Sequence, residues 1–348
     1  MILPTTYAVA LLLIVFTMLC WGSWANTFKL VGKWRFELFY YDYSLGVLIA
    51  AVILAYTFGS MGTENLTFSD NLLVAGKSRI LYGLAGGVVF NLANILLVAA
   101  ISIAGMAVAF PVGIGLALVV GVVLNYILNP QANPALLAAG VVLVALAIVF
   151  DAFAYAAHAR SKPAEPRVAG QRAKRRGGTK GIVLSLVSGV LMGSFYPLVQ
   201  LGEAGETGYA LGPYAVAVIF SIGVFASTFV FNLYFLNFPV DGEPIEMRDY
   251  FHGNWRQHLL GIVGGLIWCA GTVANFAAAS APKEVQVGPA VSYAIGQGAT
   301  MISALWGLLV WKEFAGAHPR VKWLLALMLV LFVAGLALVS IAPLYASK

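Results

Sequence analysis

The sequence predicts an all-α membrane protein with ten transmembrane helices, arranged as two inverted repeats of five helices. Three observations predict this fold. Of 348 residues, 61% are hydrophobic and only 10% are charged, and the mean hydropathy is +0.90, whereas soluble domains are about 45–50% apolar and about 25% charged. The apolar residues form ten long runs, each close to the ~20 residues that a helix needs to cross a bilayer. The two halves of the chain also share glycine and proline positions.

The expected spans are bounded by charged or turn-forming residues. Stretches such as 141–149 and 324–338 are apolar on every face, which excludes the alternating pattern of a β-barrel. In chain order the ten expected spans are Tyr7–Phe28, Phe36–Thr57, Ile80–Ile103, Met106–Leu128, Pro134–Ala157, Gly181–Leu201, Tyr214–Leu236, His258–Ser280, Val285–Val310 and Lys322–Ala342. No Lys or Arg precedes the first span, so we expect it to stay in the mature protein rather than act as a cleaved signal peptide.

The distribution of Lys and Arg predicts the orientation. Of the 20 basic residues, sixteen lie on one side of the predicted membrane, eight of them between Arg160 and Lys180, and four lie on the side that holds both termini. Loops rich in Lys and Arg stay in the cytoplasm. We therefore expect an inner (plasma) membrane protein with both termini outside. Because topology accounts for the basic residues, nucleic acid is not expected as a partner.

A polar, basic segment divides the chain. Residues 158–180 contain prolines and glycines and are expected to form a cytoplasmic linker between a first five-helix repeat, residues 1–157, and a second, residues 181–348. The linker lacks the Gly-x-x-x-x-Gly-Lys-Ser/Thr pattern of a phosphate-binding loop, so ATP hydrolysis is not predicted.

Neither the cysteines nor the histidines predict a metal or catalytic centre. Cys20 and Cys269 lie inside apolar spans, where cysteine is a small buried hydrophobe. The four histidines have no spacing typical of metal ligands. We therefore expect no metal, no enzyme activity and no cofactor, with a proton as the coupling ion.

The second half repeats the first at an offset of 178 residues. Without a gap, this offset aligns Gly83 with Gly261, Gly86 with Gly264, Gly87 with Gly265 and Pro111 with Pro289. Because each half holds an odd number of spans, the halves must cross the membrane in opposite orientations, as in many alternating-access transporters. The glycines are interpreted as helix-packing positions. Pro111 and Pro289 are predicted to be symmetric hinges, with the alternative that each merely begins a helix.

Polar and aromatic residues within the spans predict a cavity for a small neutral polar solute. An amide offers two donors and an acceptor, and a tryptophan ring offers a flat stacking face. The candidate binding residues are Trp21, Trp24, Asn26, Asn91, Asn94, Tyr196, Gln200, Asn275, Tyr293 and Gln297. The alternatives are an interhelical hydrogen bond for each amide and packing for each tryptophan.

Few carboxylates lie inside the spans, and a carboxylate there is costly unless it has a function. Asp42, or else Glu37, is predicted to carry the coupling proton. Glu37 lies near the membrane surface, where pairing with Arg35 or Lys33 is the alternative. Asp151 near the end of the fifth span is a weaker candidate.

Several motifs resemble those of a known family. The strongest are Tyr41-Asp-Tyr-Ser44 and the run Gly86–Asn94; the others are Cys20–Asn26, Phe58-Gly59, Asn125–Leu128 and Trp306–Leu309. Over nearly its whole length the chain resembles the ureide permeases of plants and bacterial relatives of the glucose/ribose porter type, within the drug/metabolite transporter superfamily. The resemblance implies ten helices in two inverted halves and proton-coupled uptake of small neutral solutes such as allantoin and nucleobases, or of monosaccharides in the sister group. It makes Asp42 the first residue to test.

The sequence thus predicts a proton-coupled importer of a ureide or nucleobase-like metabolite. A glucose/ribose-type uptake porter and a drug or metabolite exporter are the closest alternatives, followed by a channel and by a membrane protein without transport activity. The expected partners are the solute and the lipid bilayer, and assembly into a homodimer is left open.

Overall fold

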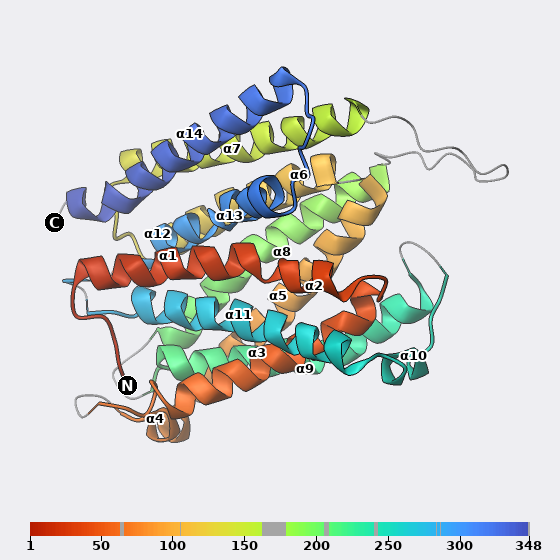
Figure 1. The fold of residues 1–348 in the computed structure, drawn as a ribbon. Coiled ribbons are helices and arrows are strands. Elements are labelled where there is room, and N and C mark those ends of the chain that lie inside the picture. The colour runs from red at the N-terminus through yellow and green to blue at the C-terminus, as the bar shows by residue number, and fades with distance from the viewer. Residues whose placement is uncertain are drawn as a thin grey trace.

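The computed structural model describes residues 1–62, 66–104, 106–161, 179–204, 209–239, 243–282, 284–285 and 287–346. These residues form helices and no strands, and ten segments are long and apolar enough to cross a membrane, which confirms the predicted number of spans (Figure 1). The elements are α1 (Tyr7–Ser23), α2 (Ala25–Val31), α3 (Phe36–Tyr56), α4 (Phe68–Val74), α5 (Lys77–Ala104), α6 (Met106–Leu128), α7 (Pro134–Ser161), α8 (Thr179–Glu203), α9 (Pro213–Asn237), α10 (Arg248–Phe251), α11 (Trp255–Ala279), α12 (Pro289–Gly296), α13 (Ala299–Leu305), η1 (Trp306–Val310), α14 (Pro319–Ile341) and η2 (Ala342–Tyr345). Most of the predicted linker, residues 162–178, lies outside the described residues.

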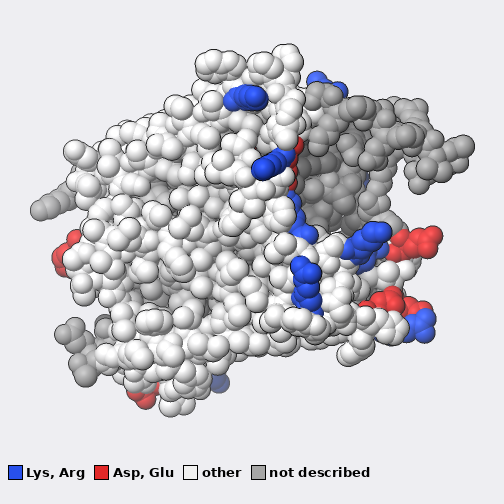
Figure 2. Space-filling view, viewed as in Figure 1, with Lys and Arg blue, Asp and Glu red and all other residues white. Residues whose placement is uncertain are grey.

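Local signals set the ends of these helices. Thr6 caps α1 by accepting a hydrogen bond from a backbone N–H at 3.3 Å. Asn254 and Gln257 form a capping box at the start of α11. Pro213 begins α9, a position at which proline costs no helical hydrogen bond. Between their ends the helices are apolar on most faces, and the face of the bundle shown in Figure 2 carries few charged side chains along the length of the helices, as lipid contact requires.

Two spans are interrupted, unlike the continuous helices that the sequence predicted. The first span consists of α1 and α2 with a turn at Trp24, and the ninth consists of α12, α13 and the π-helical η1. The interruption between α12 and α13 falls at Gln297 and Gly298. The sequence Gly296-Gln-Gly298 is the local signal for this break, because glycine weakens a helix interior.

The two prolines that the sequence suggests as hinges occupy different positions. Pro289 is the first residue of α12, the position favoured for proline and the one that the alternative interpretation expected. Pro111 lies inside α6. The break in the ninth span therefore lies two turns beyond its proline, and a hinge role for either residue stays a prediction.

Helices of the two halves pack in corresponding pairs. α5 of the first half packs against α8 and α9 of the second, and α11 of the second half packs against α1 and α3 of the first. Other pairs between the halves are α6 with α8, α1 with α12 and α13, α3 with α9, α6 with α12 and α7 with α14. The pair of α7 and α14 forms one outer layer of the bundle (Figure 1). The halves are therefore interleaved, and each buries its helices against the other.

The two ends of the bundle differ in charge. The N-terminus and the end of α14 lie at one end, which we call the terminal end (Figure 1, left). Most of the Lys and Arg side chains visible in Figure 2 lie toward the opposite end, which we call the basic end and where Lys29, Lys33 and Arg35 surround the link from α2 to α3.

Glycines let helices of opposite halves touch at their backbones. A Cβ added to Gly87 on α5 would lie 2.0 Å from the carbonyl oxygen of Phe220 on α9, and one added to Gly265 on α11 would lie 2.1 Å from that of Tyr43 on α3. The partner helices carry glycines at the same crossings, Gly223 and Gly46. These distances confirm the packing interpretation of the two aligned glycines.

Replacing Gly87 with Ala should destabilise the folded protein by about 1–3 kcal/mol, because α5 must move away from α9 to admit the methyl group. Gly115→Ala on α6 is the matched control, since a Cβ there would meet nothing within 4 Å, and both changes gain the same helix propensity. Thermal unfolding in detergent measures the difference. Equal melting temperatures for the two variants would contradict the packing role.

Candidate functional site

A cavity of about 200 Å³ lies in the middle of the bundle, between helices of both halves. Its size suits a small metabolite rather than a larger drug-like ligand. The lining residues are Trp21, Gly22, Trp24, Ala25, Phe90, Asn94, Leu97, Ile114, Met192, Phe195, Trp268, Gly296, Gln297, Ala299, Thr300 and Ser303. The structure thus brings four of the ten predicted binding residues together here: Trp21, Trp24, Asn94 and Gln297.

One wall of the cavity is aromatic. The rings of Trp21 and Trp268 stack with centroids 6.1 Å apart and an angle of 13°, and Phe90 lies on Trp268 at 4.5 Å. The indole N–H of Trp21 donates to the Thr272 hydroxyl at 3.0 Å, which holds the ring in place. Fixed, flat faces of this kind suit the stacking of a planar solute.

Two amides supply the polar edge of the cavity. Asn94 donates from Nδ2 to the Tyr40 hydroxyl at 2.9 Å, which orients its carbonyl oxygen. Within the described part of the chain that oxygen has no hydrogen bond, and the Gln297 side chain has none at all, although each residue is only 9% exposed. Such groups can bind a solute without first breaking a bond to the protein.

Gln297 lies at the break between α12 and α13. Gly296 and Gly298 flank it and pack closely on α1: a Cβ at Gly296 would lie 2.7 Å from the Trp21 ring, and one at Gly298 would lie 2.5 Å from Met18 Sδ. Interrupted helices near the membrane midplane are the places where transporters build solute sites, because the helix ends expose polar groups to a cavity.

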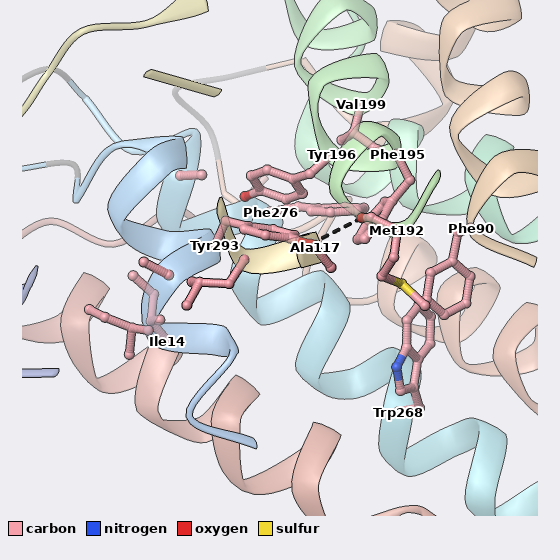
Figure 3. Close-up of a cluster of buried hydrophobic side chains, with 14 of the residues drawn as sticks. Ile14, Phe90, Ala117, Met192, Phe195, Tyr196, Val199, Trp268, Phe276 and Tyr293 are labelled. Atoms are coloured by element: carbon pink, nitrogen blue, oxygen red, sulfur yellow. Dashed lines mark hydrogen bonds between the residues drawn. The ribbon is translucent and has the colours of Figure 1, made fainter. Parts of the chain in front are cut away.

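A second cavity of about 440 Å³ opens at the terminal end, and we call it the vestibule. Three buried rings, Tyr196, Phe276 and Tyr293, which we call the ring layer, lie together (Figure 3), and their positions along the helices place them between the vestibule and the central cavity. On each of three helices one ring lies between a vestibule residue and a central-cavity residue: Gln200, Tyr196 and Met192 on α8; Ala279, Phe276 and Trp268 on α11; Pro289, Tyr293 and Gly296 on α12.

Contacts within the ring layer hold the rings and their helices together. The Tyr196 centroid lies 5.7 Å from the centroids of both Phe276 and Tyr293. The Tyr293 hydroxyl donates to the carbonyl of Met192 at 3.0 Å, which ties α12 to α8 (Figure 3). Toward the basic end the lining residues Ala25 and Ser303 are exposed. The buried rings therefore lie between the central cavity and the terminal end, and exposed lining residues lie toward the basic end.

The other predicted amides lie away from the central cavity. Asn26 donates to the Ser23 carbonyl at 2.8 Å and accepts from the Trp311 indole at 2.6 Å. Asn91 is fully buried between α5 and α9, where its Nδ2 lies 2.8 Å from the Ser227 hydroxyl and 3.1 Å from that of Thr228. The bonds of Asn91 to α9 and of Asn26 to Trp311, which follows η1, are of the interhelical kind that the alternative interpretation described.

Gln200 and Asn275 lie near the ring layer, Gln200 on the vestibule side and Asn275 next to Phe276 in α11. Gln200 donates to the side chain of Asn125, and Asn275 donates to the Ser292 carbonyl at 3.4 Å. With Tyr196 and Tyr293 they form a polar group between the two cavities. The ten predicted residues thus fall into three places: the central cavity, the ring layer and helix contacts elsewhere.

Asp42 lies in a separate cluster near the basic end. It is 2% exposed on α3, its Oδ1 accepts a hydrogen bond from the Tyr250 hydroxyl at 2.5 Å, and its Oδ2 lies 2.8 Å from His258 Nδ1. Burial raises the pKa of the Tyr250 hydroxyl, and the Asp42 carboxylate raises that pKa further, so Tyr250 keeps its proton and donates. Trp34 covers the cluster, with its ring centroid 4.9 Å from that of His258.

Sequence reasoning did not find Tyr250 or His258. Both lie more than 200 positions from Asp42, on α10 and α11, and no spacing rule links them. Glu37, the other proton candidate, pairs with Arg35 at 2.6 Å near the surface, one of the alternatives named for it.

A further cluster joins the halves at the basic end. Glu313 pairs with Lys29 of α2 and accepts from the Tyr155 hydroxyl of α7 at 3.2 Å. Asp151, one turn before Tyr155, is 5% exposed, and its Oδ1 has no hydrogen bond among the described residues. None of these four residues lines the central cavity.

The described residues contain no group of three His, Cys, Asp or Glu side chains that could hold a metal ion. Cys20 and Cys269 are both buried and unpaired with another cysteine.

Comparisons with known proteins give one family. The family model described as ureide permease matches residues 39–180 and 172–342. Ureide permease 1 of Arabidopsis thaliana is 25% identical over 353 aligned positions, covering 86% of this chain and 87% of that protein. Ureide permease 2 of the same plant is 23% identical, with 94% and 95% covered. A probable ureide permease A3 of Vigna unguiculata is 31% identical over 99 residues, 28% of this chain and 26% of that protein.

The fold is also shared with a solved structure. A crystal structure of a protein 16% identical in sequence superposes with a TM-score of 0.58, covering 95% of this chain and 96% of its own.

Proposed function

The chain belongs to the ureide permease family, whose members are membrane transporters rather than enzymes, and on this premise we propose that it is a secondary active, proton-coupled importer of a small neutral polar solute. The relatives are named as ureide permeases, which supports ureides as the solute class. Nucleobases share the same planar amide chemistry. Monosaccharides are the alternative.

The central cavity is the observation that carries this proposal. Ureides and nucleobases present adjacent N–H and C=O groups on planar amide or urea units. The stacked Trp21 and Trp268 rings match the flat face, and Gln297 and the Asn94 carbonyl match the polar edge. A sugar also stacks on aromatic rings, but it lacks the paired N–H and C=O edge that these amides complement.

We propose that the halves are inverted repeats that move by alternating access. The pairing of α5 with α8 and α9 corresponds to the pairing of α11 with α1 and α3, as expected for copies related by a twofold axis in the membrane plane. In this proposal the structure is the state open to the basic end. Opening the ring layer at Tyr196, Phe276 and Tyr293 while closing the space near Ala25 and Ser303 gives the opposite state.

We assign the basic end to the cytoplasm and both termini to the outside, because the Lys and Arg residues gather at the basic end. The solute then enters through the vestibule and leaves toward the basic end. Direction in the cell follows the gradients, and an inward proton gradient drives import.

Asp42 is the proposed proton carrier. Its carboxylate holds Tyr250 of α10 and His258 of α11 against α3. Protonation removes the negative charge on which both contacts depend, so it loosens the link between α3 and α11, which belong to different halves. Proton binding is thereby connected to movement of one half against the other. Glu37 is the alternative carrier.

Uptake by the purified protein in proteoliposomes tests the function. We expect allantoin to accumulate when an inward proton gradient is imposed and to stop accumulating when the gradient is collapsed. A thermal-shift panel of allantoin, uracil, ribose and glucose identifies the solute, since a ligand at a hundredfold excess over its Kd stabilises the protein by about 2.7 kcal/mol. Stabilisation by the sugars alone would favour the monosaccharide alternative. Uptake that does not depend on the proton gradient for any solute tested would refute proton coupling.

A further inference from the structure

Glu203 is a carboxylate at the floor of the vestibule that the proposed function does not use. It is the last residue of α8, lines the vestibule and is half-buried. Its Oε1 accepts a hydrogen bond from the Ser280 hydroxyl, at the end of α11, at 2.9 Å. Within the described part of the chain this is its one hydrogen bond, and it forms no ion pair. A carboxylate sheltered in this way without a cation is unusual in a membrane protein and points to a function.

Among the described residues, no charged group near Glu203 forms an ion pair with its carboxylate. Arg79 on α5 lies close to this end of α8, where its guanidinium donates to the Leu201 carbonyl at 2.8 Å rather than to Glu203. Met1 lines the same vestibule. The titratable groups between Glu203 and the central cavity are the hydroxyls of Tyr196, on the same helix, and of Tyr293, on α12. No other charged side chain of the described residues lines the vestibule.

A polar path leads from Glu203 toward the central cavity. Gln200 and Tyr196 lie one and two turns before Glu203 on the same face of α8. The hydroxyls of Tyr196 and Ser292 and the carbonyl oxygen of Asn275 are buried and have no hydrogen bond among the described residues. Buried polar atoms in a dry interior are nearly always paired. Water molecules bound to these unpaired atoms would join them into a chain of hydrogen bonds, which is what proton transfer requires.

We propose that Glu203 takes up the coupling proton from the terminal side. A proton passes from water in the vestibule to the carboxylate, which becomes a neutral carboxyl group, and returns to water or to the next carrier when the state changes. This inference rests on the proposed function, and it places proton uptake about one bundle length from Asp42, at the opposite end.

Infrared difference spectra of the purified protein between acid and alkaline buffer test the protonation directly and need no solute. With the acid buffer kept above about pH 6, where ordinary exposed carboxyl groups are ionised, Glu203→Gln should lose part of the protonated-carboxyl C=O band. The matched control Glu284→Gln, which removes an exposed carboxylate at the same end, should keep it. Glu203→Asp keeps the carboxyl group and should keep a shifted band. A spectrum of Glu203→Gln identical to that of the unaltered protein overturns the proposal.

Transport gives the second readout. With allantoin in proteoliposomes, Glu203→Gln should lower accumulation driven by a proton gradient at least tenfold and leave exchange of allantoin without a gradient within twofold. Equal loss of exchange and accumulation indicates a structural role and overturns the inference. If the unaltered protein neither exchanges nor accumulates allantoin, the proposed function fails, while the infrared comparison still decides whether Glu203 is the group that binds a proton.

Discussion

Gln297→Ala should weaken solute binding by roughly 30-fold, equivalent to about 2 kcal/mol. Gln297 lies at the break between α12 and α13 and lines the central cavity, and its side chain has no hydrogen bond to the described protein. Its removal therefore costs no internal contact. The loss falls on the solute, whose N–H and C=O groups leave water without a replacement partner.

Isothermal titration with allantoin measures the change in Kd, and the melting temperature without solute shows that folding is intact. The matched control is Asn237→Ala, which removes an exposed amide at the end of α9 whose bond is to its own helix, and no change in Kd is expected. Asn94→Ala should act differently, since Asn94 also holds Tyr40 and its loss should lower both affinity and stability. An unchanged Kd in Gln297→Ala would show that the break in the ninth span does not take part in solute binding.

The number of spans could be predicted from the sequence, because crossing lipid demands long apolar helices and the bilayer imposes this on composition. The break at Gln297 was not predicted. The break depends on the packing of Gly296 and Gly298 on α1. A hydropathy average over the whole span does not register two glycines, so it predicts a continuous helix. The close helix crossings at Gly87 and Gly265 could be predicted, because a repeated glycine in an apolar helix usually serves close approach of another helix.

The sequence could predict which types of residue form the candidate site, but it could not predict which of these residues lie together in the fold. Polar groups in lipid are rare enough to be noticed, so Gln297 and Asn91 stood out equally. What separates them is tertiary: Gln297 faces a cavity, whereas the Asn91 amide donates to α9. In the same way Asp42 could be singled out alone, but its partners Tyr250 and His258 come from helices that only the folded chain brings together.

Asp42→Asn should abolish accumulation of solute against a gradient and leave solute exchange in place. The amide resembles the protonated acid in charge and shape, so the variant stays in the proton-bound form at every pH. The internal-to-external solute ratio should fall to about one, the equilibrium value for a neutral solute without coupling. In the unaltered protein, uptake should rise as the pH falls on the side from which protons enter, and in the variant it should not depend on this pH.

Proteoliposome uptake of allantoin at a series of external pH values measures both effects. Asp70→Asn is the matched control, since Asp70 is an exposed carboxylate on α4 bound to Thr67 at 2.6 Å, and it should keep the pH dependence. Asp42→Asn should also keep the infrared band assigned to Glu203, because the two carboxylates lie at opposite ends of the bundle. If Asp42→Asn accumulates solute normally while Glu37→Gln does not, the coupling role moves to Glu37, and the cluster with Tyr250 and His258 serves to hold α10 against the bundle.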